Sequence, residues 1–138
     1  DLISLYNHFP SIDGFKKQLE EKQFTHRKVL TAALTKQYAH LEKKPNLDNL
    51  KDGKTFTVTT GHQLNIFTGP LYVIYKIIST LNLSRKLKAA FPDYNFVPIY
   101  WMATEDHDVE EISYFNLFGN KTLYHQIEYF IQVMLFFK

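Results

Sequence analysis

The chain has 138 residues, 45% hydrophobic and 22% charged, which is the composition of an ordinary globular protein with one domain. Its net charge of +2 is small, and its Lys and Arg residues are spread along predicted helices, so we expect no nucleic-acid partner. The chain contains no cysteine, which excludes disulfides, thiolate metal sites and a cysteine nucleophile within it and fits a reducing cytoplasm.

The two ends of the sequence predict no contact with a membrane. The first residues lack the basic and apolar segments of a signal peptide. The apolar run at residues 131–137 is far shorter than the roughly 20 residues that a membrane-spanning helix needs. We therefore expect a cytoplasmic protein without a membrane partner.

The first fifty residues predict a helical segment. Apolar residues recur at helical spacing over residues 11–22 and 25–43, and Thr25 is a candidate cap for the second of these helices. Residues 46–53 then form a connection with room for one short helical turn, which Asp52-Gly53 ends as a turn signal.

Residues 55–101 predict a strand, a helix and a second strand. Residues 55–60 are β-branched or aromatic, as in a strand, and Gly61 then begins a loop. A helical pattern follows over residues 70–90, and residues 96–101 form an almost wholly apolar strand, typical of burial on both faces. A βαβ unit of this length has parallel strands, so the fold class is α/β. Six residues of the helix are expected to face inward: Leu71, Ile74, Ile77, Ile78, Leu81 and Leu87.

The remainder of the chain is less regular. Residues 108–117 predict a third strand-to-helix connection, and residues 122–138 fit neither a strand nor a helix. We therefore divide the chain into a helical segment (1–50), a βαβ core (51–120) and an aberrant or truncated tail (121–138).

Both unusual clusters of polar residues follow predicted strands. The first spans residues 60–70 and the second spans residues 103–108. Ligands of open parallel sheets bind outside the carboxyl ends of the strands, where both clusters are expected. The two clusters are therefore expected to share one cleft.

The first cluster has the features of a strand-to-helix loop that can bind an anion. Gly61 allows a sharp turn, and Gly69 allows unusual torsions or a close approach by a ligand. Pro70 suits the first helical position, whose neighbouring amides attract a carboxylate or phosphate, and Lys76 could reach the same ligand. A plain structural turn explains the same residues, and the spacing is not that of a P-loop.

Four further side chains of this region could touch a ligand. His62 and Gln63 could donate or accept hydrogen bonds, and Tyr72 and Tyr75 could line the cleft. The alternatives are a structural histidine and tyrosines that serve helix packing.

The second cluster combines carboxylates with an imidazole. Glu105, Asp106 and His107 are candidates for binding a hydroxyl or amine, and crowding of their charges should raise one carboxyl pKa. Alternatively, these side chains could bind a divalent cation. Asp108 and the acidic residues after it are explained by stabilisation of a helix start.

Together, these motifs resemble the cysteine-adding enzyme family of bacillithiol biosynthesis. The matching segments are residues 60–63 (Thr-Gly-His-Gln), 67–72 (Phe-Thr-Gly-Pro-Leu-Tyr), 75–77 (Tyr-Lys-Ile), 98–101 (Pro-Ile-Tyr-Trp) and 105–108 (Glu-Asp-His-Asp). Their order and intervals agree with the family over residues 56–117, whereas the resemblance is expected to end near residue 120. Family members often carry Gln where this chain has His62.

The resemblance implies a Rossmann-like core related to nucleotidyltransferases and class I aminoacyl-tRNA synthetases. It also implies a ligase that joins the carboxyl group of cysteine to the amine of glucosaminyl-malate, with ATP as the co-substrate. Full-length members are several times longer and form homodimers through a C-terminal coiled coil. The implied catalytic residues are Glu105, Asp106 and His107. The substrate- or nucleotide-binding candidates are Gly61, His62, Gln63, Thr68, Gly69, Pro70, Tyr72 and Lys76.

Two other functions fit the same residues. The chain could be a catalytically inactive, truncated form of this fold that binds a small ligand. It could also be a metal-dependent hydrolase that uses Glu105, Asp106, His107 and His62.

Overall fold

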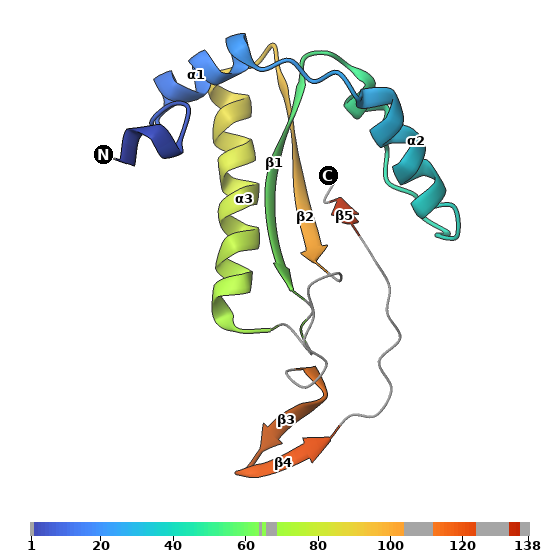
Figure 1. Cartoon of the computed structure of the whole chain (residues 1–138). Helices are drawn as coiled ribbons and strands as arrows, with labels where there is room; N and C mark the ends of the chain where they lie inside the picture. The colour runs from blue at the N-terminus through green and yellow to red at the C-terminus, as the bar shows by residue number, and fades with distance from the viewer. Residues whose placement is uncertain (1, 64, 66–68, 104–111, 124–132, 136–138) are drawn as a thin grey trace. The chain divides into compact units, whose positions relative to one another are not determined.

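A computed structural model of the chain describes residues 2–63, 65, 69–103, 112–123 and 133–135 (Figure 1). The chain divides into two units. One unit contains Asp1–Phe56 and Arg85–Phe96, and the other contains Thr57–Ser84 and Val97–Lys138. The predicted boundaries at residues 50 and 120 remain predictions.

The first unit begins with the 3-10 turn η1 (Leu2–Leu5) and the helix α1 (Ile12–Glu21). Ser11 caps α1, because its side chain accepts a hydrogen bond of 3.1 Å from the amide of Gly14. Gly14 is buried, and a Cβ atom there would lie 2.0 Å from the carbonyl oxygen of Phe9. This close approach explains why a glycine stands near the start of α1.

The second helix, α2 (Arg27–Gln37), is shorter than the sequence predicts. Its N-cap residue is His26, so the prediction that Thr25 caps this helix is wrong. The helix ends before residue 43, because the chain turns at residues 38–40. The short helical turn expected in the following connection is confirmed as η2 (Asp48–Lys51).

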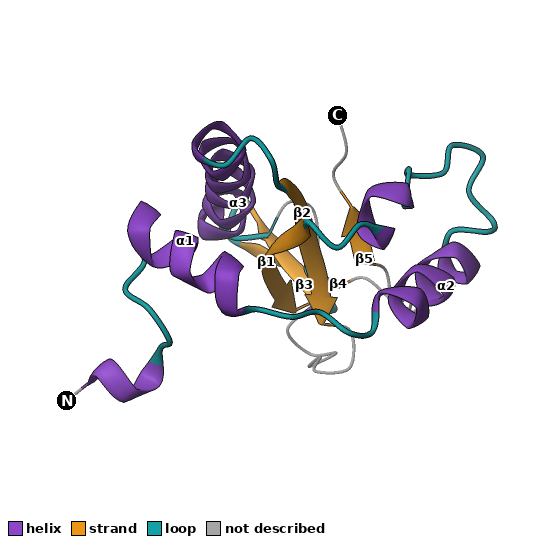
Figure 2. Cartoon of the chain, turned by 90° about the horizontal axis from the view of Figure 1, so that it is seen from above, coloured by secondary structure: helices purple, strands orange, loops and turns teal. Residues whose placement is uncertain are grey.

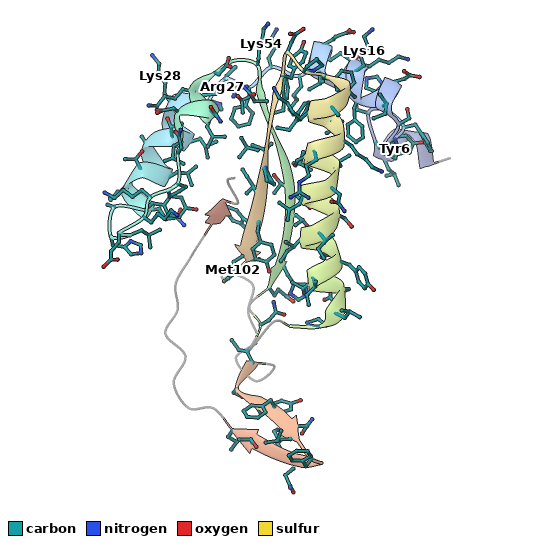
Figure 3. All side chains as sticks on the ribbon, turned by 180° about the vertical axis from the view of Figure 1, so that it is seen from behind. Tyr6, Lys16, Arg27, Lys28, Lys54 and Met102 are labelled. Carbon is teal, nitrogen blue, oxygen red and sulfur yellow. The ribbon has the colours of Figure 1, made fainter. Side chains whose placement is uncertain are left out.

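Arg27 ties the start of α2 to the chain around η2 (Figure 3). Its guanidinium group donates hydrogen bonds to the carbonyl oxygens of Leu50, Gly53 and Thr55, at 3.2, 3.2 and 2.7 Å. Leu50 is among the most deeply buried side chains of the described chain. A single cation therefore satisfies three carbonyl groups beside a buried leucine.

The predicted βαβ unit is confirmed as β1 (Thr55–Gln63), α3 (Leu71–Ala90) and β2 (Asn95–Ala103). β1 and β2 are hydrogen-bonded neighbours, and their arrows in Figure 1 point in the same direction, as expected for parallel strands. Figures 1 and 2 both show α3 running alongside these strands. The fold is therefore of the predicted α/β class.

The turn from α3 into β2 is held by Lys88. Its ammonium group donates to the carbonyl oxygens of Pro92 and Tyr94 and to the side-chain oxygen of Asn95, at 2.8, 3.0 and 3.2 Å. All three protons of the ammonium group are thereby used within the turn. The amide of Asn95 also donates to the carbonyl oxygen of Lys54, which brings the starts of the two strands together.

The buried face of α3 differs from the predicted one. Leu71, Ile74 and Ile78 are exposed, and the prediction that they face inward is wrong. Leu87 is buried, as predicted, and Ile77 and Leu81 are half-buried, whereas Val73, Thr80 and Ser84 are buried in place of the three exposed residues. The hydroxyl groups of Thr80 and Ser84 donate to the helix carbonyls four residues earlier, both at 2.9 Å, which permits their burial.

A third strand pairs with β2 on the side away from β1. This strand, β5 (Val133–Leu135), is antiparallel to β2, with Tyr100 opposite Met134. It lies within the tail for which the sequence predicts no regular structure. Its distance in sequence from β2 explains why no local pattern indicated the pairing.

Residues 114–123 form a hairpin of β3 (Tyr114–Leu117) and β4 (Asn120–Leu123), so the prediction of a strand-to-helix connection through residue 117 is wrong for residues 114–117. Phe118 and Gly119 form its two-residue turn, with φ angles of 50° and 80°. Positive φ at both positions is typical of a type I′ turn, which matches the twist of paired strands. Among the described residues, no helix is both long and apolar enough to cross a membrane.

Candidate functional site

The candidate site lies where β1 and β2 end. β1 ends at Gln63 and β2 ends at Ala103, and the two strands are neighbours that run in the same direction. Figure 3 marks this end of β2 with Met102. The expectation that both strands deliver their following residues to one edge of the sheet is therefore supported by the strands themselves.

Several candidate residues lie outside the described residues. These are Thr68 of the first cluster and Glu105, Asp106 and His107 of the second. Asp108, the expected helix cap, lies outside them as well. Their proposed roles remain predictions, as does the shared cleft.

Gly61 lies within β1, so the prediction that a loop begins at this residue is wrong. A Cβ atom on Gly61 would lie 2.6 Å from the carbonyl oxygen of Trp101 on the neighbouring strand. The glycine is therefore needed for the close approach of β1 to β2, and the strand continues through His62 to Gln63.

Gly69 has the unusual torsion that the sequence predicts. Its φ angle is 64°, in the left-handed region that favours glycine. A Cβ atom there would also lie 2.7 Å from the side chain of Asn65. Asn65 in turn donates a hydrogen bond of 3.0 Å to the carbonyl oxygen of Gln63. Asn65 thus lies against Gly69 and is hydrogen-bonded to Gln63, contacts that the sequence did not indicate.

Pro70, the predicted first helical position, immediately precedes α3, so the helix begins one residue later than predicted. Its carbonyl oxygen accepts a hydrogen bond of 2.9 Å from the amide of Val73. One amide of the first helical turn is therefore engaged within the protein. Binding of an anion at this helix start remains a prediction.

His62 and Tyr72 contact each other directly. Nε2 of His62 is hydrogen-bonded to the hydroxyl group of Tyr72, and the ring centroids lie 5.1 Å apart. Nδ1 of His62 lies 3.0 Å from the carbonyl oxygen of Gln63. The end of β1 and the first turn of α3 are thereby joined through side chains that the sequence places ten residues apart.

Lys76 completes this group. Its ammonium group donates a hydrogen bond of 3.1 Å to the carbonyl oxygen of Gly61 and lies 5.4 Å from the centroid of the Tyr72 ring. A cation at this distance from a ring face is attracted by the negative charge of that face. Four predicted site residues are therefore linked in a series of contacts, from His62 through Tyr72 and Lys76 to Gly61.

Tyr100 lies buried on β2. Burial raises the pKa of its hydroxyl above the usual value, and the nearby hydroxyl of Tyr72 raises it further. Tyr100 therefore remains a neutral hydrogen-bonding group at physiological pH.

A groove with a volume of about 480 Å³ runs between β1 and α3, and we call it the β1–α3 groove. Its polar lining comes from Thr59, Thr60, Tyr72, Tyr75, Lys76, Ser79 and Thr80. Thr59, Ser79 and Thr80 were not predicted to line a site. The signal for Ser79 was available, because residues 72, 75, 76 and 79 have the spacing of one helix face.

Metal binding finds no support among the residues that the structure describes. No group of three or more His, Asp or Glu side chains lies together within that part of the chain. The metal-dependent hydrolase hypothesis relies on Glu105, Asp106 and His107, which lie outside the described residues, so this hypothesis is not tested by the structure.

Comparison with known proteins identifies a family. Residues 1–134 match the family described as the bacillithiol biosynthesis protein BshC, N-terminal Rossmann-like domain. The match continues past residue 120 and includes most of the segment that we describe as a tail.

Individual relatives carry the same description. The chain is 57% identical over 130 residues to a candidate cysteine ligase BshC of Flavobacterium psychrophilum, and 54% identical over 129 residues to that of Flavobacterium johnsoniae. Each alignment covers 88% of this chain and 24% of the relative. A relative from Christiangramia forsetii is 54% identical over 129 residues, with the same coverage. The chain therefore spans about a quarter of the length of these relatives.

Proposed function

Because the chain belongs to the BshC family of bacillithiol biosynthesis, in which it corresponds to the N-terminal Rossmann-like domain, we propose that it serves a ligase that adds cysteine to glucosaminyl-malate. The observation that carries this proposal is the family match over residues 1–134. The names of the relatives, which describe candidate cysteine ligases, support the same reaction class.

The reaction forms an amide bond between the carboxyl group of cysteine and the amine of glucosaminyl-malate. A free carboxylate is a poor acceptor for an amine, so the carboxyl group has to be activated, and ATP is the proposed co-substrate. The Rossmann-like fold supports this choice, since such sheets bind nucleotides beyond the carboxyl ends of their strands.

Residues at the two strand ends receive different roles in this proposal. The loop that contains Gly69 and Pro70 holds an anionic group of a substrate at the start of α3. Glu105 or Asp106 orients the attacking amine or a ribose hydroxyl, and His107 is available for proton transfer. Lys76, which lies beside the end of β1, adds a positive charge to this edge of the sheet.

The cellular setting is part of the proposal. A chain without cysteine suits the reducing cytoplasm, where the small-molecule substrates would be found. We place the whole protein there as a homodimer, with neither nucleic acid nor a membrane as a partner.

The test uses a full-length family member that carries this domain. It is incubated with cysteine, glucosaminyl-malate and ATP, and the amide product is measured by mass spectrometry. Replacement of Gly69 by Ala or of Asp106 by Asn, at the corresponding positions, should reduce product formation at least about tenfold. Both variants should keep their circular dichroism spectra, and Lys86→Ala serves as a control.

Normal turnover in both variants would reject the assignment of these two residues. Absence of any product from the unaltered full-length protein would reject the ligase function itself. Binding of the substrates without turnover would favour the alternative of an inactive binding protein.

A further inference from the structure

The β1–α3 groove combines a mainly apolar surface, to which Val58 and Leu83 contribute, with several hydroxyl groups. Its described polar residues are mainly hydroxyl-bearing, with Thr59 and Thr60 from β1 and Tyr72, Tyr75, Ser79 and Thr80 from α3. Among the described lining residues there is no carboxylate, and Lys76 is the one cation. A ligand that suits this lining has apolar faces, hydroxyl groups at its edge and little charge.

The hydrogen bonds of His62 determine which way the Tyr72 hydroxyl points. The carbonyl oxygen of Gln63 can only accept, so Nδ1 of His62 carries the proton that is donated across 3.0 Å. In the neutral ring, Nε2 then has a bare lone pair and accepts the hydroxyl proton of Tyr72. The Tyr72 oxygen is left with lone pairs that can accept a proton from a ligand.

Lys76 is partly engaged. It donates one hydrogen bond to the carbonyl oxygen of Gly61 and sits over the ring of Tyr72. Its charge disfavours a ligand ammonium group next to the Tyr72 oxygen, since like charges repel. The partner of the Tyr72 oxygen is therefore a hydroxyl group or a neutral amine.

The two tyrosines also offer an apolar surface. Tyr72 is 50% exposed and Tyr75 is 62% exposed, although both lie on a helix that packs on a sheet. The negative face of an aromatic ring attracts the C–H groups on the face of a sugar ring. Exposed aromatic rings beside hydroxyl groups match a sugar, which is apolar on its faces and polar at its rim.

We propose that the β1–α3 groove binds the sugar ring of the amine substrate, with the Tyr72 oxygen accepting a hydrogen bond from a hydroxyl group or a neutral amine of that ring. In this arrangement His62 is a positioning residue, because it acts by orienting the Tyr72 hydroxyl. The identity of the sugar as the glucosaminyl group rests on the proposed function. The volume of about 480 Å³ is sufficient for a single sugar ring with a substituent.

Binding is tested on the 138-residue chain by NMR titration, with glucosaminyl-malate, methyl glucoside and malate as separate probes. The first two should shift amide signals of residues 58–60 and 72–79. Malate alone should leave these signals unchanged. Shifts caused by malate and absent with methyl glucoside would overturn the proposal.

Substitutions then distinguish ligand binding by Tyr72 from the orientation of Tyr72 by His62. Tyr72→Phe should weaken binding of methyl glucoside about fivefold to tenfold, because one hydrogen bond is lost. His62→Gln should bind normally, since its amide oxygen can accept the Tyr72 proton, whereas His62→Leu should bind as weakly as Tyr72→Phe. Tyr94→Phe, outside the groove, is the matched control, and equal affinity in all four variants would overturn the proposal.

Failure of this inference can be told apart from failure of the ligase function. If sugar binding depends on Tyr72 but the full-length protein makes no amide, the assignment of the groove stands and the ligase function is rejected. If the full-length protein forms the amide and its Tyr72→Phe variant keeps the same KM for glucosaminyl-malate, the assignment of the groove is rejected and the ligase function stands.

Discussion

The two units of the chain use their cationic side chains differently. In the first unit, Arg27 donates to three backbone carbonyl oxygens and Lys88 donates to three acceptors in one turn. In the second unit, Lys76 has one hydrogen bond within the described chain, to the carbonyl oxygen of Gly61, and faces the ring of Tyr72.

This difference distinguishes cations that stabilise the fold from a cation that can bind a ligand. A cation that already donates three hydrogen bonds within the protein gains little from a ligand, because a new hydrogen bond would largely replace an existing one. Within the described residues, Lys76 donates one hydrogen bond beside a groove, so its remaining donors there can serve recognition of a ligand. The predictions that follow test whether stability depends on the first kind of cation and binding on the second.

The largest effect is expected for Arg27→Met. The substitution leaves the carbonyl oxygens of Leu50, Gly53 and Thr55 without their donor, and it should lower the free energy of unfolding by about 3 kcal/mol. Urea denaturation measures the change. Lys28→Met, at the exposed next position, is the control and should change stability by less than about 0.5 kcal/mol. Equal stability of both variants would contradict the structural role of Arg27.

A slightly smaller effect is expected at the end of β1. Gly61→Ala places a methyl group 2.6 Å from the carbonyl oxygen of Trp101, and it should lower the free energy of unfolding by about 2 kcal/mol. Gly53→Ala is the matched control, because a Cβ atom there meets nothing within 4 Å. Thermal denaturation of the two variants should differ clearly. A stable Gly61→Ala protein would show that β1 and β2 can separate at no cost.

The two lysines provide the direct comparison. Lys88→Met should lower the free energy of unfolding by about 1 kcal/mol, since it opens the turn between α3 and β2. Lys76→Met should have a smaller effect on stability and should instead alter binding in the β1–α3 groove. Urea denaturation measures the changes in stability, and NMR titration with glucosaminyl-malate measures the change in binding. A reversed pattern would refute the distinction between the two kinds of cation.

The smallest effect concerns Tyr100 and alkaline pH. Its raised pKa means that the folded chain holds the hydroxyl proton more tightly than the unfolded chain does. The resulting stability is present below about pH 10 and is lost as pH rises from there through the raised pKa. Tyr100→Phe should therefore lose less stability between pH 9 and 11 than the unaltered chain, as measured by urea denaturation. An unchanged slope would contradict burial of an intact hydroxyl, and the exposed Tyr6→Phe serves as the control.

Local sequence predicted the βαβ unit because its signals agree with one another. β-branched residues mark β1, an apolar run marks β2, and Pro70 and Pro92 bracket the helix between them. The strand ends were placed too early, because Gly61 is a poor strand former on its own. Its place in β1 depends on the close approach of Trp101, which only the paired strands reveal.

The helix face and the hairpin could not be predicted for a related reason. Large aliphatic residues suggested that Leu71 and Ile78 face inward, but small residues allow a helix to lie closer to a sheet. In the hairpin, the acidic residues before it suggested a helix start, and the turn at Phe118-Gly119 was overlooked as a hairpin signal.

The site itself remains a prediction, but the contacts among four of its proposed members could be expected in part from the sequence, whereas their hydrogen bonding could not. Residue order placed Gly61, His62, Tyr72 and Lys76 near one strand end, and the structure brings them into contact. The proton position on His62 depends on a carbonyl oxygen in the folded chain, so no sequence pattern could indicate it.

The small buried residues of α3 have a consequence for how the family can diverge. A larger side chain at position 80 or 84 would push the helix off its sheet, whereas a change from hydroxyl to methyl keeps the spacing. Volume, more than hydrophobicity, should therefore limit substitution at these two positions. Relatives are expected to alternate among Ala, Ser, Thr and Val there, and to vary freely at the exposed positions 71, 74 and 78.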